Sequence, residues 1–187
     1  RLERGRRAQW CAVEAGKRIA ERGGNAVDVA IAVLLTEAVT NPSFASLGGG
    51  GFAMVKIPNK KIMNKTGGVE TLDFREVAPG ATDEKYYLSK AKDASITGGT
   101  AVGVPGVPAG LWELHRKYGK MHWSELFTTP IQLAEKGFRV TGGWYDDTQA
   151  AYKRFDAQSQ LLFLKEGEPL KPGTLLVQKR LARALHQ

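Results

Sequence analysis

The amino-acid sequence predicts an α+β protein in which helices come before and after a pair of strands. An almost wholly apolar stretch over residues 26–39 has the length of a helix and the composition of a buried one. Stretches at residues 52–57 and 71–74 have strand composition, and helical patterns resume near residue 109. Because the overall composition is that of an ordinary globular protein, we expect residues 1–187 to form a single domain, or part of one, without an internal linker.

The first two predicted elements are helices with a sharp boundary between them. Residues 11–22 have helix-forming composition and end at Gly23-Gly24, which is typical of a helix C-terminus. Asn25 and Asp28 then have the spacing of a capping box, with aspartate in place of the usual glutamate. Asn41-Pro42 ends the second helix, since a residue before proline avoids helical angles.

Four consecutive glycines, Gly48–Gly51, separate the second helix from the first strand. Phosphate-binding glycine loops follow a strand and open a helix, whereas here the order is helix, glycines, strand. No Gly-Lys-Ser/Thr follows the run either, so a P-loop is excluded. We therefore expect these glycines to pack the first strand, which turns at residues 58–61, against the buried helix.

The second strand leads into the sequence D-F-R-E over residues 73–76. If the alternation of a strand continues, Asp73 and Arg75 share one face and Phe74 lies on the other. An arginine fork can hold a carboxylate through two parallel hydrogen bonds, and a neighbouring acid can keep the guanidinium in place. From the residues alone, a structural Asp–Arg pair and a substrate-binding arginine both remain open.

The rest of the chain is predicted to be mainly helical. A segment rich in proline and glycine over residues 100–110 is expected to be extended. Helices are then predicted at residues 109–118, 124–136, 145–155 and 178–187, with a short strand at residues 161–165.

Several classes of protein are disfavoured by composition. One cysteine, Cys11, excludes an internal disulfide, and the three histidines have no metal-ligand spacing, so no metal and no cofactor are predicted. No apolar run approaches the length of a membrane span, and no signal peptide is recognised. The net charge of +8 leaves a non-catalytic basic module for an anionic polymer as an alternative, although the basic residues are scattered and no nucleic-acid partner is predicted.

Taken in order, six stretches of the chain resemble the large subunit of the gamma-glutamyltranspeptidase family. They read G-G-N-A-V-D-V-A-I-A, N-P, L-G-G-G-G-F, D-F-R-E-V-A-P, V-G-V-P-G-V-P-A-G and P-I-Q-L-A-E-K-G-F-R-V, and together they cover nearly the whole chain from about residue 8. The resemblance implies the αββα sandwich of N-terminal-nucleophile hydrolases, of which this chain would be a large-subunit fragment.

The same resemblance implies a function and a site. Members of the family transfer the gamma-glutamyl group of glutathione to water, amino acids or peptides, and their arginine in the D-F-R-E stretch, here Arg75, binds the alpha-carboxylate. The nucleophile is a threonine that begins the small subunit of a self-cleaving precursor, so we expect no catalytic residue in this chain, no activity of the chain alone, and a heterodimer with the small subunit. A periplasmic or extracellular location is implied as well. A related acylase or an enzyme that processes poly-gamma-glutamate is the alternative within the same fold.

Overall fold

The computed structural model describes residues 6–58, 61–62, 65–83 and 85–187. Within it the chain divides into two compact units, one made of Arg1–Ser46 with Gly119–Gln187 and the other of Leu47–Tyr118. The expectation of a single domain over residues 1–187 stays a prediction.

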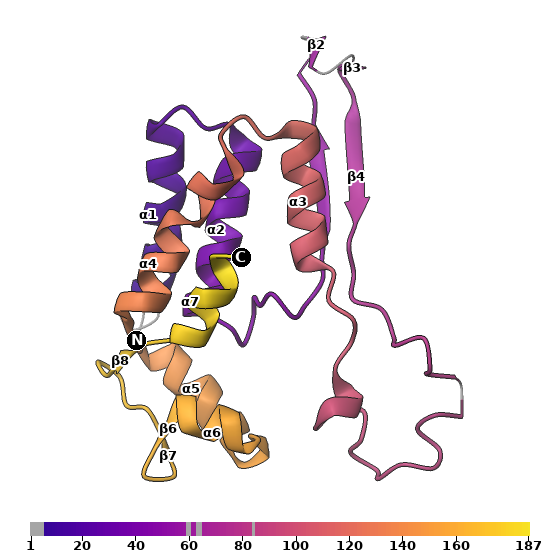
Figure 1. The fold of residues 1–187 in the computed structure, drawn as a ribbon, viewed down its shortest axis with the longest axis vertical. Coiled ribbons are helices and arrows are strands. Elements are labelled where there is room, and N and C mark those ends of the chain that lie inside the picture. Colours follow the sequence, from indigo (N-terminus) through magenta and orange to yellow (C-terminus); the bar gives the residue numbers. More distant parts are fainter. Residues whose placement is uncertain (1–5, 59–60, 63–64, 84) are drawn as a thin grey trace. The chain divides into compact units, whose positions relative to one another are not determined.

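The first unit is mainly helical (Figure 1). Its helices are α1 (Arg6–Glu21), α2 (Ala26–Thr40), η2 (Trp123–Phe127), α4 (Thr128–Lys136), α5 (Gly142–Ala151), η3 (Tyr152–Arg154), α6 (Ala157–Phe163) and α7 (Lys179–Leu185). Two small antiparallel pairs join them: β5 (Phe138–Arg139) with β8 (Leu175–Leu176), and β6 (Leu164–Lys165) with β7 (Glu168–Pro169). Helix α2 packs against α1 and α4, and α4 packs against α7, so α2 lies at the centre of this unit. The buried position of α2 confirms what its apolar sequence predicts.

The start of α2 is fixed by the predicted capping box. The side chain of Asn25 accepts hydrogen bonds from the backbone N–H groups of Val27 and Asp28, while Asp28 Oδ2 accepts one from Asn25 N at 2.9 Å. Asp28 is fully buried and also accepts hydrogen bonds from the backbone of Lys120 and Met121. The carboxylate that caps α2 therefore also ties residues 120–121 to that helix end.

The second unit is built on an antiparallel hairpin. Strand β1 (Phe52–Lys56) pairs with β4 (Val69–Asp73), with Phe52 opposite Asp73. A second pair, β2 (Lys61–Ile62) with β3 (Lys65–Thr66), continues the hairpin, and the unit also contains η1 (Gly99–Ala101) and α3 (Val107–Tyr118). Residues 59–60 of the predicted turn lie outside the described residues.

Helix α3 runs beside the hairpin of its own unit (Figure 1). At its last residue, the hydroxyl of Tyr118 donates a hydrogen bond to Glu70 Oε2 of β4. Desolvation, followed by this hydrogen bond and the charge of Glu70, raises the pKa of Tyr118 to about 12. The end of α3 is thereby anchored to β4.

Most predicted elements are present, and the differences are local. The predicted strand over residues 161–165 is wrong for its first three residues, because Asp156 caps a helix that runs to Phe163. The helix predicted for residues 124–136 begins as the 3-10 segment η2 and continues as α4. Helix α5 begins at Gly142, three residues earlier than predicted, because the side chain of Thr141 accepts a hydrogen bond from Trp144 N. Within the described residues, no helix is both long and apolar enough to cross a bilayer.

Candidate functional site

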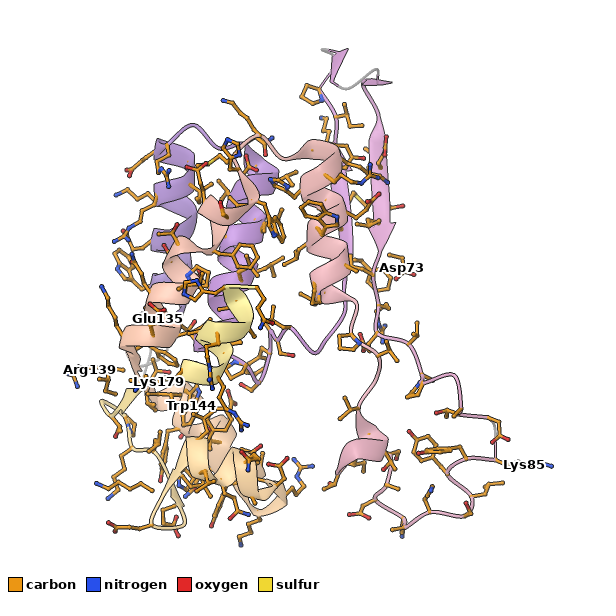
Figure 2. The ribbon with its side chains drawn as sticks, viewed as in Figure 1. Asp73, Lys85, Glu135, Arg139, Trp144 and Lys179 are labelled. Atoms are coloured by element: carbon orange, nitrogen blue, oxygen red, sulfur yellow. The ribbon has the colours of Figure 1, made fainter. Side chains whose placement is uncertain are left out.

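The candidate site is the D-F-R-E segment, which begins at the end of strand β4, where Figure 2 labels Asp73. Asp73 and Arg75 are exposed and Phe74 is half-buried, so the predicted alternation of faces is confirmed. The carboxylate of Asp73 accepts a hydrogen bond from the backbone N–H of Arg75 at 2.9 Å. Asp73 therefore fixes the backbone of Arg75, which is a different contact from the side-chain pair that the sequence left open.

The guanidinium of Arg75 has its own neighbours. Its Nη2 lies 3.4 Å from Glu76 Oε1, and its Cζ lies over the ring of Phe52, 5.7 Å from the ring centroid. The side chain of Arg75 is 56% exposed. A hydrogen bond from its own backbone lowers the pKa of Glu76, and the charge and hydrogen bond of Arg75 lower it further, against partial desolvation. An exposed guanidinium is thus held near an ionised carboxylate, with most of its donors facing solvent.

The glycine run lies against this segment. A Cβ placed on Gly50 would lie 2.2 Å from Glu76 N and 2.6 Å from Arg75 C, and one placed on Gly51 would lie 2.9 Å from the ring of Phe74. Backbone hydrogen bonds join Gly51 and Phe74 in both directions, which extends the β1–β4 pairing by one residue on each side. Gly50 and Gly51 therefore pack closely, as predicted, whereas packing of the first strand against the buried helix stays a prediction. Their nearest atoms belong to residues 74–76, because the hairpin register brings the residue before Phe52 opposite the residue after Asp73.

A second set of glycines closes on the same segment from residues 103–110. A Cβ on Gly106 would lie 1.8 Å from Phe74 O, one on Gly110 would lie 2.2 Å from Phe74 Cγ, and one on Gly103 would lie 3.2 Å from Glu76 Cβ. Gly106 N also donates to Gly49 O at 2.9 Å, so the two glycine segments are joined directly. We call these two segments, residues 49–51 and 103–110, the glycine cradle of residues 74–76.

Arg75 is predicted from the sequence, but the residues that hold it are not. Phe52, Glu76 and the cradle glycines of residues 103–110 were not identified as parts of the site. The sequence does contain a signal for the second glycine segment, because the repeated small residues of V-G-V-P-G-V-P-A-G indicate that another part of the chain approaches closely there. Sequence spacing alone does not show which segment such glycines approach.

The arrangement can bind an anion, and the described residues around it contain no reactive pair. A planar guanidinium on a fixed backbone suits the two oxygens of a carboxylate. No group of histidine, cysteine, aspartate or glutamate side chains suitable for a metal ion occurs among the residues that the structure describes. The site is therefore suited to recognition of a carboxylate, and its geometry gives no step of bond cleavage.

A hollow of about 360 Å³ lies in the first unit between Pro42 and α5–α6. Its apolar wall includes Trp144, Phe155 and Phe163, and at its rim the hydroxyl of Ser43 donates to Asp147 Oδ2 at 3.1 Å. None of the described lining residues is a histidine or lysine that would act as base, so this serine–aspartate pair lacks the partner that an activated nucleophile needs.

Residues 12–187 match the family model described as gamma-glutamyltranspeptidase. The chain belongs to the gamma-glutamyltranspeptidase family. It is 40% identical over 185 residues to a glutathione hydrolase proenzyme from Pseudomonas sp. (strain A14), an alignment that covers 95% of this chain and 31% of that protein. The similarity thus extends over nearly the whole chain, and the predicted relationship is confirmed.

Solved structures give the same result at the level of the fold. The crystal structure of the gamma-glutamyltranspeptidase of Helicobacter pylori superposes with a TM-score of 0.87 at 35% identity, covering 94% of this chain and 50% of that one. The cephalosporin acylase of Bacillus halodurans superposes with a TM-score of 0.80 at 27% identity, covering 94% of this chain and 33% of that one. These matches confirm the predicted fold class, the α+β fold of the N-terminal-nucleophile hydrolases.

The chain spans about a third of the length of the Pseudomonas relative and half of the Helicobacter chain. Within the family it corresponds to the N-terminal portion of a large-subunit-like region.

Proposed function

We propose that this chain is part of an enzyme that transfers or hydrolyses gamma-glutamyl groups, with glutathione and related compounds as substrates, and that Arg75 binds the alpha-carboxylate of the gamma-glutamyl moiety. The family assignment supports the reaction class. The nucleophile would be a threonine at the start of a small subunit that is cut from the same precursor, and the word proenzyme in the names of the relatives supports such a precursor. The heterodimer, not this chain alone, would be the active species.

The observation that carries the assignment of Arg75 is the combination of a fixed backbone and an exposed side chain. Asp73 and Gly50 restrain the backbone of Arg75, while 56% of its side chain remains accessible. The N–H groups of a purely structural arginine on a sheet edge would be expected to donate hydrogen bonds to acceptors within the protein. Among the described residues, the hydrogen bond of this guanidinium goes to Glu76 at 3.4 Å, which is long for a charge-assisted bond. An incoming carboxylate would have a planar set of donors to bind.

The test uses the complete, processed protein that contains this chain. Arg75→Lys keeps the charge and loses the fork, and Arg75→Ala loses both. Because hydrogen bonds to charged groups contribute roughly 1.5–3 kcal/mol each, kcat/KM for a gamma-glutamyl anilide should fall by about one to several powers of ten, with alanine the more severe. Self-cleavage of the precursor should continue, since its own peptide bond presents no alpha-carboxylate.

The control is the same anilide with its alpha-carboxylate converted to a carboxamide. Both Arg75 variants should turn over this control almost as well as the unchanged protein does. Equal losses on both substrates, or arrested maturation, would mean that Arg75 is structural. Absence of turnover by the unchanged, processed protein would contradict the proposed reaction itself.

A second candidate within the same fold is an acylase. The likeness to the cephalosporin acylase of Bacillus halodurans favours including it, although the identity of 27% is lower than for the glutathione hydrolase relative. Enzymes that process poly-gamma-glutamate are a further variant of the proposed reaction. Comparing turnover of a cephalosporin with that of glutathione by the processed protein separates the two candidates.

The remaining expectations are part of the same proposal. No cofactor and no metal take part, and no nucleic acid is bound; the basic residues Lys179, Arg180 and Arg183 of α7 would belong to solvated surface, and Arg180 already donates to Gln158 at 2.6 Å. A periplasmic or extracellular location would suit an enzyme of glutathione breakdown. Binding to DNA that weakens steeply with salt would instead favour a basic binding module.

A further inference from the structure

Phe52 occupies an unusual position for an aromatic side chain. It is the first residue of β1, directly after the glycine run, and 67% of its surface is exposed. The register places it opposite Asp73, on the same face of the hairpin as the side chain of Arg75. The ring therefore contributes little to the described core, and its defined contact is with the guanidinium above it.

The geometry of that contact is specific. The Cζ atom of Arg75 lies over the ring of Phe52 at 5.7 Å from its centroid, within the distance at which the negative face of an aromatic ring attracts a cation. The N–H donors of a guanidinium lie along the edges of its plane. A ring that holds the guanidinium by its face would therefore restrict the side chain without occupying the donors that a carboxylate needs.

Two other contacts limit where the guanidinium can go. Asp73 fixes the Arg75 backbone, and Glu76 Oε1 lies 3.4 Å from Nη2. Without the ring, the flexible arginine side chain would be free to swing fully onto Glu76 or into solvent. Binding a carboxylate would then require first ordering the side chain, which weakens affinity.

We propose that Phe52 is a positioning residue for Arg75: the face of its ring holds the guanidinium so that the edge donors are presented to a substrate carboxylate. This inference rests on the proposed function of Arg75 and adds the group that orients it. It also gives a reason for an aromatic residue at the exposed end of the glycine run. A small or aliphatic residue there would extend the strand equally well but would lack the negative ring face.

The experiment compares Phe52→Leu and Phe52→Tyr in the complete, processed protein. Leucine keeps an apolar side chain and loses the ring, whereas tyrosine keeps the ring. For the gamma-glutamyl anilide, Phe52→Leu should raise KM by about two- to five-fold, the range expected for an exposed cation–π contact, with kcat little changed. The carboxamide control should show no rise in KM, and Phe52→Tyr should behave like the unchanged protein.

A matched control is available on the same strand. Met54 has its side chain on the same exposed face, two residues further along β1, and Met54→Leu should leave KM unchanged for both substrates. If Phe52→Leu does not mature, a series of mono- to trifluorinated phenylalanines at position 52 replaces it, because fluorine weakens the ring face while nearly preserving its size. KM for the carboxylate substrate should then rise with each added fluorine.

The variants test the role of Phe52 separately from the carboxylate-binding role of Arg75 on which it rests. A carboxylate-dependent loss in Arg75→Ala together with unchanged KM in Phe52→Leu, or a flat fluorine series, would overturn the role of Phe52 and leave the role of Arg75 intact. Equal rises in KM for both substrates would also overturn it, since they would indicate a general packing effect. A lack of any carboxylate-dependent loss in Arg75→Ala would contradict the proposed function instead. In an Arg75→Ala background, Phe52→Leu should add nothing to the loss.

Discussion

Replacing Gly50 by alanine is expected to displace Arg75 without touching its side chain. The added Cβ would lie 2.2 Å from Glu76 N and 2.6 Å from Arg75 C, whereas ordinary contacts begin at 3.4 Å. The nearest atom is backbone, so it cannot rotate away as a side chain would. The Arg75–Glu76 peptide therefore has to move by about 1.2 Å, or the glycine strand has to move by as much in the other direction.

Two consequences of this displacement can be measured in the complete protein. Overpacking of this kind costs about 1–3 kcal/mol of unfolding free energy, which urea or thermal unfolding detects. A displacement of about 1 Å at a group that binds substrate can cost roughly 100-fold in rate, so kcat/KM for a gamma-glutamyl anilide should fall by more than the loss of stability alone would produce. The carboxamide control should be affected less, because it does not use Arg75. Gly50→Val should be worse than Gly50→Ala on both measures.

The control for Gly50→Ala is Gly80→Ala. Gly80 is in the same unit, and a Cβ there would meet nothing within 4 Å. Its substitution should leave the unfolding free energy and both activities unchanged. If Gly50→Ala matched Gly80→Ala in stability and in carboxylate-dependent activity, the contact between the glycine run and residues 74–76 would not be tight, and the positional argument for the glycine cradle would be refuted.

Two further predictions concern residues away from the candidate site. Asp28→Ala removes the buried carboxylate that accepts hydrogen bonds from the backbone N–H groups of residues 25, 120 and 121, so the unfolding free energy should fall by more than about 2 kcal/mol in urea titrations, whereas alanine at the exposed Asp146 should have little effect. Tyr118 has a pKa of about 12 in the folded protein, raised from its ordinary value of 10, so the stability it contributes is complete below pH 10 and is lost as the pH rises towards 12. Unfolding measured against pH should show that loss in the unchanged protein, and a Tyr118→Phe variant with the same alkaline slope would contradict it.

The parts of the fold that the sequence predicted depend on local signals. The capping box of Asn25 and Asp28 and the apolar run of α2 act within a few residues, and both appear in the structure as expected. The strand prediction is wrong for residues 161–163 because apolar residues there are compatible with either a strand or a helix. The N-cap at Asp156 favours the helix. The second role of Asp28, as acceptor for residues 120–121, spans 92 residues of sequence and has no local signature.

The candidate site shows the same limit in a sharper form. Arg75 was identified through a resemblance, while residue physics left open a structural pair with Asp73. In the structure, Asp73 accepts a hydrogen bond from the backbone N–H of Arg75, while Phe52 and Glu76 lie next to the guanidinium. Of these, Phe52 lies 23 positions away along the chain. Its contact follows from the β1–β4 register, which a single sequence does not specify.

The meeting of three sequence stretches at one place explains why each was individually weak as a signal. The stretches L-G-G-G-G-F, D-F-R-E-V-A-P and V-G-V-P-G-V-P-A-G come together as residues 49–52, 73–77 and 103–110. They are joined by the hydrogen bond from Gly106 N to Gly49 O and by the bridge between Val77 and Val104. Whether one of these positions requires glycine depends on which segment packs against it, because the lack of space for a Cβ is created by the neighbouring segment. At Gly50 and Gly106 an added Cβ would clash with backbone atoms. The stability lost in an alanine variant at either position should therefore not be restored by shortening a side chain elsewhere in the cradle. At Gly110 the clash is with the Phe74 side chain, nearest at Cγ, so Gly110→Ala should be partly rescued by Phe74→Ala, which removes Cγ and the rest of the ring and keeps only Cβ. The difference between these positions separates backbone contacts from side-chain contacts in the cradle.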